Sequence, residues 1–430
     1  MSKPLSIAIA GLGTVGGGTL HLLERHAGLI ELRCGRKVKV VAVSARDRKR
    51  DRKLDLSGMT WFDDAAKMAK EAEAEVIVEL IGGSEGIAKT ICENAIATGK
   101  HVVTANKALL AHHGLALAIK AEANGVSLHF EAAVAGGIPI IKGLREGLAG
   151  NGISRVYGIL NGTCNYILTN MRETGKDFAE VLEEARKLGY AEADPSFDID
   201  GIDTAHKLAI LTSVAFGCDT NFDAVYVEGI RHVSALDISF AEELGYRIKL
   251  LGIARLTEHG VEQRVHPCLV PGRSSIAHVE DVQNAVMVEG DFVGKIVFQG
   301  RGAGAGPTAS AVVADLVDIA RGTKVPTFAV PAARLAKIPP SPMDRHRGAY
   351  YLRLMVADQP GVIADVAAAL RDEGISLESM LQHGRAAAGA VPVVLTTHET
   401  AEAAMSRALK RIGALTAVFE PPRMIRVEPL

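Results

Sequence analysis

Short runs of apolar residues alternate with amphipathic stretches along the first 150 positions of the chain. The apolar runs predict β-strands at Leu5–Ala10, Val38–Val43, Glu75–Ile81, His101–Thr104 and Val126–Phe130. The stretches between them predict helices near Val15–Arg25, Asp63–Ala72, Ile87–Thr98 and Lys107–Asn124. Because strands that alternate with helices join through right-handed crossovers, residues 1–150 are expected to form a doubly wound parallel sheet.

The pattern changes after residue 150. Helices are predicted near Ala179–Lys187 and Ile202–Phe216, followed by strands at Ile248–Arg255, Val261–His266 and Ala285–Gly290. This mixture is typical of an α+β unit, to which we assign residues 151–306. A further helical pattern near Ala311–Arg321 belongs to a region, 307–335, that is expected to return to the first domain.

Three prolines at 339, 340 and 342 predict a stiff linker over residues 337–349. A complete βαββαβ order follows at 350–430, with strands at Tyr351–Val356, Ile375–Leu381 and Val391–Thr397, a last strand near Val418, and helices at Pro360–Asp372 and Ala401–Arg411. The composition of the linker and the complete pattern beyond it predict a separable C-terminal module.

Charge and cysteine usage exclude several classes of protein. Lys plus Arg total 48 against 50 Asp plus Glu, a net charge of -2, so no basic footprint for nucleic acid is expected. No apolar run reaches the ~18 residues that a membrane span needs. The five cysteines form no CxxC pair and no dense disulfide pattern, which indicates a reducing, cytoplasmic setting.

The segment GLGTVG follows the first predicted strand and opens a helix. Gly11 and Gly13 would bring backbone N–H groups close to a pyrophosphate at the helix N-terminus, beside Thr14 and Val15, and Gly16 would let helix and strand pack closely. This context predicts a Rossmann-like dinucleotide site, although a merely tight strand–helix turn has the same glycines.

The end of the second strand bears on the choice of cofactor. It lacks the acidic residue that binds an unmodified ribose and carries Arg46 instead. A guanidinium suits a 2′-phosphate, so NADP is favoured, with NAD also acceptable. The alternative is an exposed basic loop, since Asp47 and Asp51 interleave with its cations.

The candidate catalytic residues lie in two segments. Thr104 and Lys107 follow a strand at the carboxyl edge, where open α/β sheets bind ligands. Asp203 and Lys207 are i,i+4 at the start of an apolar helix, an arrangement that would hold the ammonium as a proton donor. An ordinary helical salt bridge and a solvated lysine are the plain alternatives. Carboxylates nearby would suit a cationic substrate or a divalent metal, at Glu192, Asp198 and Asp200.

Two glycine-rich loops, 131–139 and 300–307, each precede a helical pattern. Both would offer backbone groups to a ligand or ion, or would serve only for close packing.

Taken together, these motifs and several others make the chain resemble homoserine dehydrogenases almost from end to end. The motifs that carry the resemblance, in order, are GLGTVG, TANKALLA, EAAVAGGIPI, GILNGTCNYIL, LGYAEADPSFDIDGIDTAHK and GRGAGAGPTASAV. The resemblance implies that Lys207 is the proton donor, that Asp203 positions it and the substrate, and that Lys107 assists. Glu192 and Asp198 would bind substrate, and Thr104, Lys107, Gly189 and Gly306 would join the cofactor site. A monovalent cation, sodium, would be bound at Glu131, Val134, Gly136 and Ile138.

The implied reaction is the reversible, NAD(P)H-dependent reduction of L-aspartate 4-semialdehyde to L-homoserine, with residues 151–306 as the catalytic and dimerisation domain. Residues 350–430, with Asp358–Val362 between strand and helix, resemble an ACT regulatory domain. That resemblance implies an amino-acid effector, threonine, and a homodimer or homotetramer, although the Ala/Gly run at 385–390 has no effector-like side chain. Two other hypotheses are a non-enzymatic sensor and a reductive dehydrogenase of a different amino acid.

Overall fold

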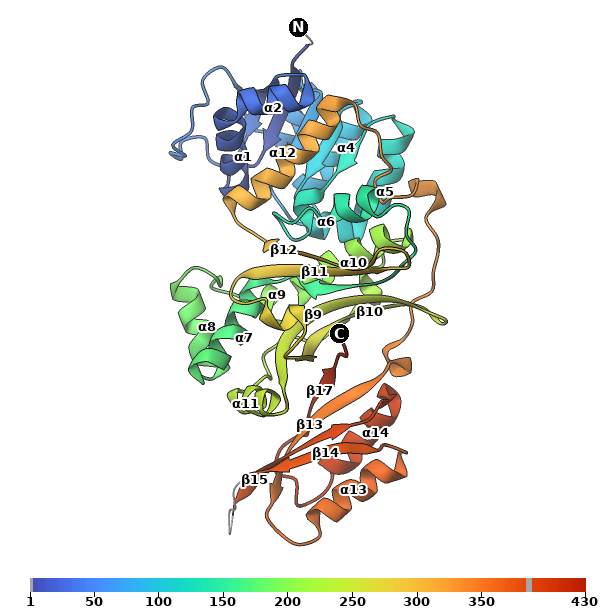
Figure 1. Ribbon diagram of the computed structural model, residues 1–430. Helices are drawn as coiled ribbons and strands as arrows, with labels where there is room; N and C mark the ends of the chain where they lie inside the picture. The colour runs from blue at the N-terminus through green and yellow to red at the C-terminus, as the bar shows by residue number, and fades with distance from the viewer. Residues whose placement is uncertain (1–2, 384–388) are drawn as a thin grey trace.

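The computed structural model describes residues 3–383 and 389–430, so most of the Ala/Gly run at 385–390 lies outside the described residues. Figure 1 shows three parts stacked along one long axis, with the N-terminal sheet at the top and the C-terminal unit at the bottom. The predicted α/β class and its three parts are confirmed.

The N-terminal sheet is parallel throughout and has the strand order β3-β2-β1-β4-β5-β6. Its strands are β1 (Leu5–Ala10), β2 (Val38–Ser44), β3 (Thr60–Trp61), β4 (Val76–Glu79), β5 (His101–Thr104) and β6 (Leu128–His129). The order reverses between β1 and β4, which creates the crevice where doubly wound sheets bind nucleotides.

Helices cover both faces of this sheet because alternate side chains of each strand point to opposite sides. Ala8 and Ala10 of β1 pack toward α3 (Ala65–Glu71), α4 (Ile87–Ala97) and α5 (Lys107–Ala123). Ile7 and Ile9 pack toward α1 (Thr14–Arg25), α2 (Ala27–Cys34) and α12 (Ala305–Arg321). Figure 1 shows α12, in orange, lying beside α1 on the blue domain. A helix from far along the chain thus completes the N-terminal layer.

The central sheet is antiparallel, in the order β12-β11-β7-β9-β10. Its strands are β7 (Ile153–Ile159), β9 (Tyr246–Thr257), β10 (Gly260–Pro271), β11 (Gln283–Gly290) and β12 (Gly294–Arg301), with β8 (Tyr226–Val227) beside β10. Its helices are α6 (Ile140–Lys142), α7 (Gly162–Thr174), α8 (Phe178–Lys187), α9 (Ser196–Ile199), α10 (Ile202–Phe216) and α11 (Ala235–Glu243). The hydrophobic pattern missed α2, β7, α7, α11 and β12.

The C-terminal unit consists of β13 (Arg347–Ala357), α13 (Val362–Asp372), β14 (Leu377–Gln382), β15 (Ala390–Thr397), β16 (Thr400–Ala401), α14 (Glu402–Gly413) and β17 (Arg423–Val427). The predicted last strand near Val418 is wrong, since Val418 makes only an isolated bridge to Val356. Pro421 and Pro422 interrupt the pattern there, and the strand begins after them.

The C-terminal unit is not a separate sheet. Strand β17 pairs antiparallel with β13 and parallel with β10, so the sheet continues from the central part into the C-terminal part. The Glu428 carboxylate, just after β17, accepts hydrogen bonds from Arg264 on β10 and from Arg155 on β7, the latter at 2.8 Å. These contacts tie the predicted module to the central part, because removing it would take away the Glu428 carboxylate that Arg264 and Arg155 share. That the module can be separated from the catalytic part stays a prediction.

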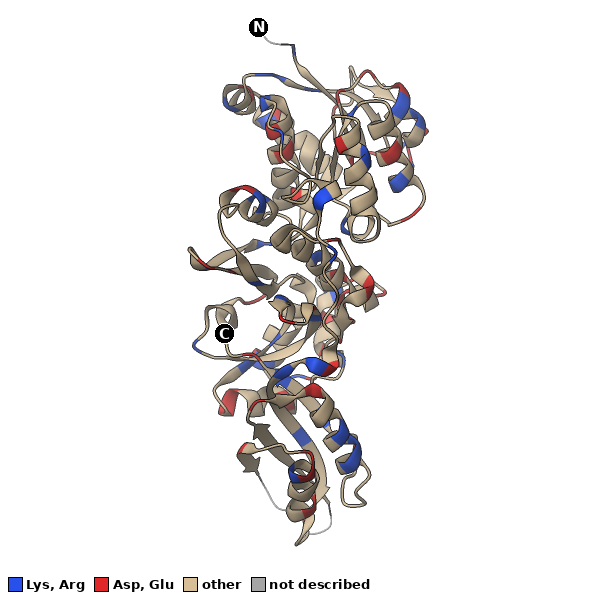
Figure 2. Ribbon diagram, turned by 90° about the vertical axis from the view of Figure 1, so that its right-hand side faces the viewer, with Lys and Arg blue, Asp and Glu red and all other residues tan. Residues whose placement is uncertain are grey.

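Residues predicted as a stiff linker pack against the central sheet. The Ser341 amide donates to the Val261 carbonyl at 2.8 Å, and the His346 ring contacts the Glu262 carboxylate at 3.2 Å. Figure 2 shows Lys and Arg interspersed with Asp and Glu along the whole length, as expected from the balanced composition. Within residues 3–383 and 389–430, no helix combines the length and the apolar character needed to cross a membrane.

Candidate active site

A second lysine, Lys107 of the N-terminal part, pairs with Asp203 in addition to the predicted partner Lys207. Lys107 is the first residue of α5, which follows β5, and Asp203 lies in the first turn of α10. The Asp203 Oδ1 lies 2.6 Å from Lys107 Nζ, and its Oδ2 lies 2.7 Å from Lys207 Nζ. One carboxylate thus holds two ammonium groups where the N-terminal and central parts meet.

The surroundings shift the pKa values of this group. Burial alone would raise the pKa of Asp203, but Lys207 and Lys107 outweigh it and hold that pKa well below its usual range. Burial lowers the pKa of Lys207, an effect that Lys107 adds to and Asp203 opposes. Lys207 Nζ also donates to the Leu160 carbonyl at 2.6 Å, which fixes its position.

Asn161 belongs to this site, although sequence reasoning assigned it no role. Its Nδ2 donates to Asp203 Oδ2 and to Asp198 Oδ1, both at 2.8 Å. Its Oδ1 accepts from the Cys164 amide and so caps helix α7. The available signal was an asparagine directly before a helical pattern in GILNGTCNYIL.

The other predicted substrate residues surround Lys107. Burial, with help from Asp203, raises the pKa of Asp198. Glu192 is exposed and acts on Lys107 only through its charge. Burial lowers the pKa of Lys107, but Asp203, with Asp198 and Glu192, outweighs this and raises it. The Lys107 ammonium also lies 5.4 Å from the centre of the Phe197 ring. Two lysines on one carboxylate disfavour a divalent metal here.

The glycine turn has the geometry that a nucleotide needs. Gly11 has φ 101°, and a Cβ there would lie 2.6 Å from the Leu80 carbonyl oxygen. A Cβ on Gly16 would lie 2.0 Å from the Gly11 carbonyl oxygen, so helix α1 and strand β1 approach through that glycine. A Cβ on Gly13 would have nothing within 4 Å, which leaves open space beside Thr14 and Val15 at the start of α1.

The remaining predicted cofactor residues differ in their exposure and in whether their polar groups already have hydrogen-bond partners. Arg46 is exposed, just beyond β2. Gly306 lies in the first turn of α12, which adjoins α1, and Gly189 has φ 78° just after α8. The Thr104 hydroxyl is already engaged, because it donates to Glu79 Oε2 at 2.6 Å and accepts from the Asn106 amide at 3.0 Å.

The sequence analysis did not predict a role for Glu79, because it reads only as the last residue of the apolar strand β4. Its Oε1 accepts from the Ile81 and Gly82 amides at 2.7 and 3.0 Å. Together with its bond to Thr104, this fixes the turns that follow β4 and β5 at the carboxyl edge of the sheet.

The loop predicted to bind a cation is buried and strained. Ala135 has φ 53° and Gly136 has φ 46°, and a Cβ on Gly136 would lie 2.3 Å from the Gly302 carbonyl oxygen. In the described part of the chain, no hydrogen bond reaches the carbonyl oxygens of Val134 or Gly136, whereas the Ile138 carbonyl accepts from Ile140. Buried carbonyl oxygens without donors fit a bound cation.

Glu131 opens this loop. Its carboxylate accepts from the Ile141 and Lys142 amides at 2.9 and 2.8 Å, and its own amide donates to Asp315. Burial and the nearby Asp315 raise the pKa of Glu131 to about 7. The side chain thus holds the start of α6, while the Glu131 carbonyl accepts a hydrogen bond from the Val134 amide at 3.5 Å within the loop.

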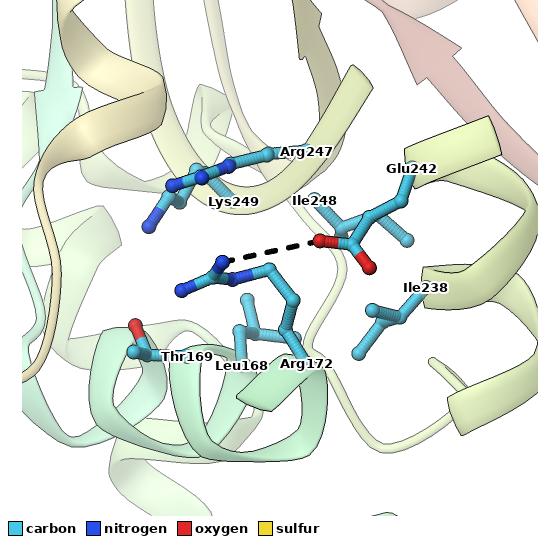
Figure 3. A pocket seen from close by; sticks show the side chains of 8 residues that line it. All are labelled: Leu168, Thr169, Arg172, Ile238, Glu242, Arg247, Ile248 and Lys249. Carbon is cyan, nitrogen blue, oxygen red and sulfur yellow. Dashed lines mark ion pairs between the residues drawn. The ribbon is translucent and has the colours of Figure 1, made fainter. Parts of the chain in front are cut away.

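A charged pocket elsewhere is too small for a substrate. Figure 3 shows Arg172, Arg247 and Lys249 converging from α7 and β9, with the Arg172 guanidinium 3.9 Å from Glu242. The space between them holds about 10 Å³, room for a single water. Glu280 pairs with all three cations, which makes this cluster a structural tie between α7, α11 and β9.

Comparisons with known proteins cover nearly the whole chain. The family model of homoserine dehydrogenase matches residues 139–317, that of the homoserine dehydrogenase NAD-binding domain matches residues 11–131, and that of the ACT domain matches residues 350–415. A homoserine dehydrogenase from Pseudomonas aeruginosa is 49% identical over 435 residues, with 100% of both chains covered.

Solved structures agree with these matches. The crystal structure of a homoserine dehydrogenase from Thiobacillus denitrificans aligns with a TM-score of 0.94 and 49% identity, over 99% of this chain and 98% of that chain. A hyperthermophilic archaeal homoserine dehydrogenase in complex with NADPH aligns with a TM-score of 0.65 and 27% identity, over 76% of this chain and 100% of that chain. The chain therefore belongs to the homoserine dehydrogenase family and is an NAD(P)-dependent oxidoreductase that acts on a CH–OH group.

Proposed function

We propose that Lys207 protonates the carbonyl oxygen of L-aspartate 4-semialdehyde as the aldehyde is reduced to L-homoserine. The observation that carries this assignment is the pair of lysines on Asp203, since one carboxylate fixes both ammonium groups in a buried site. When bound, the nicotinamide supplies the hydride. Lys207 then gives its proton to the developing alkoxide, and Asp203 stays ionised throughout.

The other side chains bind and orient the substrate. Lys107, which pairs with Asp203 and is partly exposed, would contact the bound substrate. Glu192 and Asp198 would attract the ammonium group of the substrate. Asn161 keeps Asp203 and Asp198 side by side and so sets the distance between the proton donor and the substrate's ammonium. Substrate profiling would distinguish this assignment from reduction of a different amino-acid aldehyde.

NADP is the proposed cofactor, with NAD also accepted. The residues that would hold it are Gly11, Gly13, Thr14, Val15, Gly16, Arg46, Thr104, Lys107, Gly189 and Gly306. The exposed Arg46 guanidinium fits a 2′-phosphate, and the archaeal relative is complexed with NADPH. The engaged Thr104 hydroxyl supports a role in fixing the turn that carries Lys107.

A monovalent cation, sodium, is proposed for the loop at Glu131, Val134, Gly136 and Ile138. Its support is the buried carbonyl oxygens of Val134 and Gly136, to which no described residue donates. The cation would hold the loop against Gly302, close to the N-terminus of α12.

Threonine is the proposed effector, acting through the ACT domain of a homodimer or homotetramer. Its support is the ACT match at residues 350–415 and the continuous sheet that links that region to the catalytic part. A reducing, cytoplasmic setting is proposed because all five cysteines are unpaired.

The proposed chemistry is tested by Lys207→Ala, with Lys89→Ala as the control, because Lys89 lies on α4 and makes an ion pair with the exposed Glu85. Oxidation of NADPH by aspartate semialdehyde should fall by about 10²-fold or more in Lys207→Ala, because general-acid catalysis is typically worth ~10²–10⁴. NADPH binding, measured by fluorescence titration, should be unchanged. Turnover above about a tenth of wild type would assign the proton donor to another group.

A further inference from the structure

A pair of histidines lies beside the catalytic lysines but takes no part in the proposed chemistry. His112 on α5 and His206 on α10 approach with their Nε2 atoms 3.3 Å apart. Their rings are nearly perpendicular, with centroids 5.3 Å apart and planes at 70°. The same two helices carry Lys107 and Asp203, so the histidine pair spans the junction at which the active site is assembled.

The spacing of the two nitrogens is that of a metal chelate. A tetrahedral metal with Zn–N bonds of ~2.0–2.1 Å separates two of its ligand atoms by about 3.3 Å. In the free protein, one Nε2–H donates a hydrogen bond to the other Nε2. On metal binding the donor ring would move its hydrogen from Nε2 to Nδ1, where the other ring already carries its own, so that both rings bind through Nε2 with no net loss of protons.

The site is preorganised on one side and open on the other. The His206 ring stacks on Phe222, with centroids 4.3 Å apart and planes at 13°, and on Phe197 at 5.5 Å. His206 is buried, whereas His112 is exposed and gives solvent ions access to the pair. Binding would cost His206 little conformational freedom, since the neighbouring aromatic rings already fix its side chain.

The charges around the pair permit a cation. Burial, with help from His112, lowers the pKa of His206 to about 4, while Asp203 raises that pKa and Lys107 lowers it further. The ring is therefore neutral near pH 7, the form that binds metals. Lys107 repels a dication, but it is itself paired with Asp203.

Two other clusters of possible ligands already contain cationic side chains. Arg264 donates to Glu428 in the His266–Cys268–Glu428 cluster, and Lys142 pairs with both carboxylates of the His129–Asp315–Asp318 cluster. The His112–His206 pair has no such side chain between its nitrogens.

We propose that His112 and His206 form a binding site for a divalent transition metal of the zinc class, with water completing the coordination. Imidazole nitrogen is a preferred ligand of Zn²⁺, Cu²⁺ and Ni²⁺. The bound ion would tie α5 to α10, the two helices that carry Lys107 and Asp203.

The test is isothermal titration of the full-length protein with ZnCl₂, using wild type, His112→Gln and His113→Gln. His113 is the matched control because it is the next residue on α5 and pairs instead with Glu85. Wild type and His113→Gln should bind one Zn²⁺ per chain with micromolar affinity, and His112→Gln should bind at least tenfold more weakly. Without metal, the turnover of His112→Gln should equal that of wild type.

Electron paramagnetic resonance of two proteins tests whether both imidazole rings bind the same metal ion. The Cu²⁺-loaded wild type should show hyperfine coupling to two imidazole nitrogens by electron paramagnetic resonance, and His206→Phe, which retains an aromatic ring between Phe197 and Phe222, should lose it. Equal zinc affinity in wild type and His112→Gln, or coupling to fewer than two nitrogens, would overturn the proposal and leave the pair as a hydrogen bond between two helices.

Discussion

At the scale of single residues, Asp203 organises the active site. It holds two lysines that reach it from different parts of the chain, and Asn161 orients it by donating to the oxygen that also meets Lys207. A buried carboxylate is costly unless it is paired, and here the pairing keeps it ionised. The same contacts hold Lys207, the proposed proton donor, in place, so stability and the proposed chemistry depend on one side chain.

Asp203→Asn is predicted to reduce kcat for aldehyde reduction by about 10²-fold or more, a loss typical of general-acid catalysis. The pH profile should change as well. Lys207 must be protonated, so the rate falls as pH rises through the Lys207 pKa, which burial lowers and Asp203 raises. Without Asp203 the Lys207 pKa is lower, so this high-pH limb of the rate profile should move to lower pH. A limb that stays in place would show that Lys207 is not the titrating group.

Arg46→Ala is predicted to raise the KM for NADPH by about 10–100-fold, because a hydrogen bond to a charged group contributes ~1.5–3 kcal/mol. The KM for NADH should change little, since NADH lacks the 2′-phosphate. Steady-state kinetics with both cofactors measure the ratio. Lys39→Ala, a change in an exposed β2 residue, serves as the control, and equal changes for the two cofactors would contradict the assignment of Arg46.

At the scale of elements, the β1–α1 turn shows how two glycines in one motif meet different physical demands. Gly16 is required for packing, because any Cβ there would collide with the Gly11 carbonyl. Gly13 is not required for packing, because its surroundings within the protein are open and its φ of -79° suits any residue, so we assign it to the proposed nucleotide site. The same motif is therefore predicted to contain one position that limits folding and one that limits binding.

Gly16→Ala and Gly13→Ala are predicted to separate these effects. Gly16→Ala should lower the melting temperature by several degrees, because α1 must move away from β1. Gly13→Ala should melt like wild type but bind NADPH at least tenfold more weakly, since its methyl group would occupy space beside the pyrophosphate. Differential scanning calorimetry and fluorescence titration measure the two properties, and the reverse order of effects would refute this division.

At the scale of the whole molecule, the C-terminal unit, which matches the ACT domain, shares a sheet with the central part. Strand β17 lies between β10 and β13, and buried ion pairs cross the junction. On the same side, Tyr351 and Arg353 of β13 contact Asp237 of α11 at 3.1 and 2.7 Å. A ligand that altered the C-terminal unit would act directly on strands of the central sheet.

Glu428→Ala is predicted to destabilise the full-length protein by about 3 kcal/mol, the lower end of the ~3–5 kcal/mol for a broken buried ion pair, because Arg155 loses this carboxylate and Arg264 keeps Glu262 as its partner. Glu399→Ala is the control, because the Glu399–Arg347 pair is exposed at 66% and 60% and should contribute little. Urea unfolding measures both. Similar stability in the two variants would favour the predicted separable module, and truncation before β13 would then leave a folded enzyme.

The same junction should make stability depend on acid pH. Burial would raise the pKa of Glu262, but hydrogen bonding to His346 and the charge of Arg264 outweigh it and lower that pKa to about 2. A carboxyl with a lowered folded pKa stabilises the protein above its unfolded pKa of ~4.3 and loses that contribution as pH falls. The melting temperature should therefore fall between pH 4.5 and 2, and Glu262→Gln should flatten that slope.

The sequence by itself determined the fold class, the nucleotide turn and the two segments that carry the candidate catalytic residues. These features are local, since strand and helix periods, the glycine spacing and an i,i+4 pair lie within a few residues of one another. The hydrophobic pattern did not predict elements whose sequence period is weak. Strand β12 is largely exposed, and the amphipathicity of α11 is slight, so neither produces a clear period.

Only the tertiary structure decided which distant residues share a site. It placed Lys107 on Asp203 and Asn161 between two carboxylates, and it joined the predicted C-terminal module to the central sheet through β17. Each of these contacts joins residues separated by tens to hundreds of positions. No local pattern encodes them, because burial and charge pairing are satisfied only once the sheets and helices have packed.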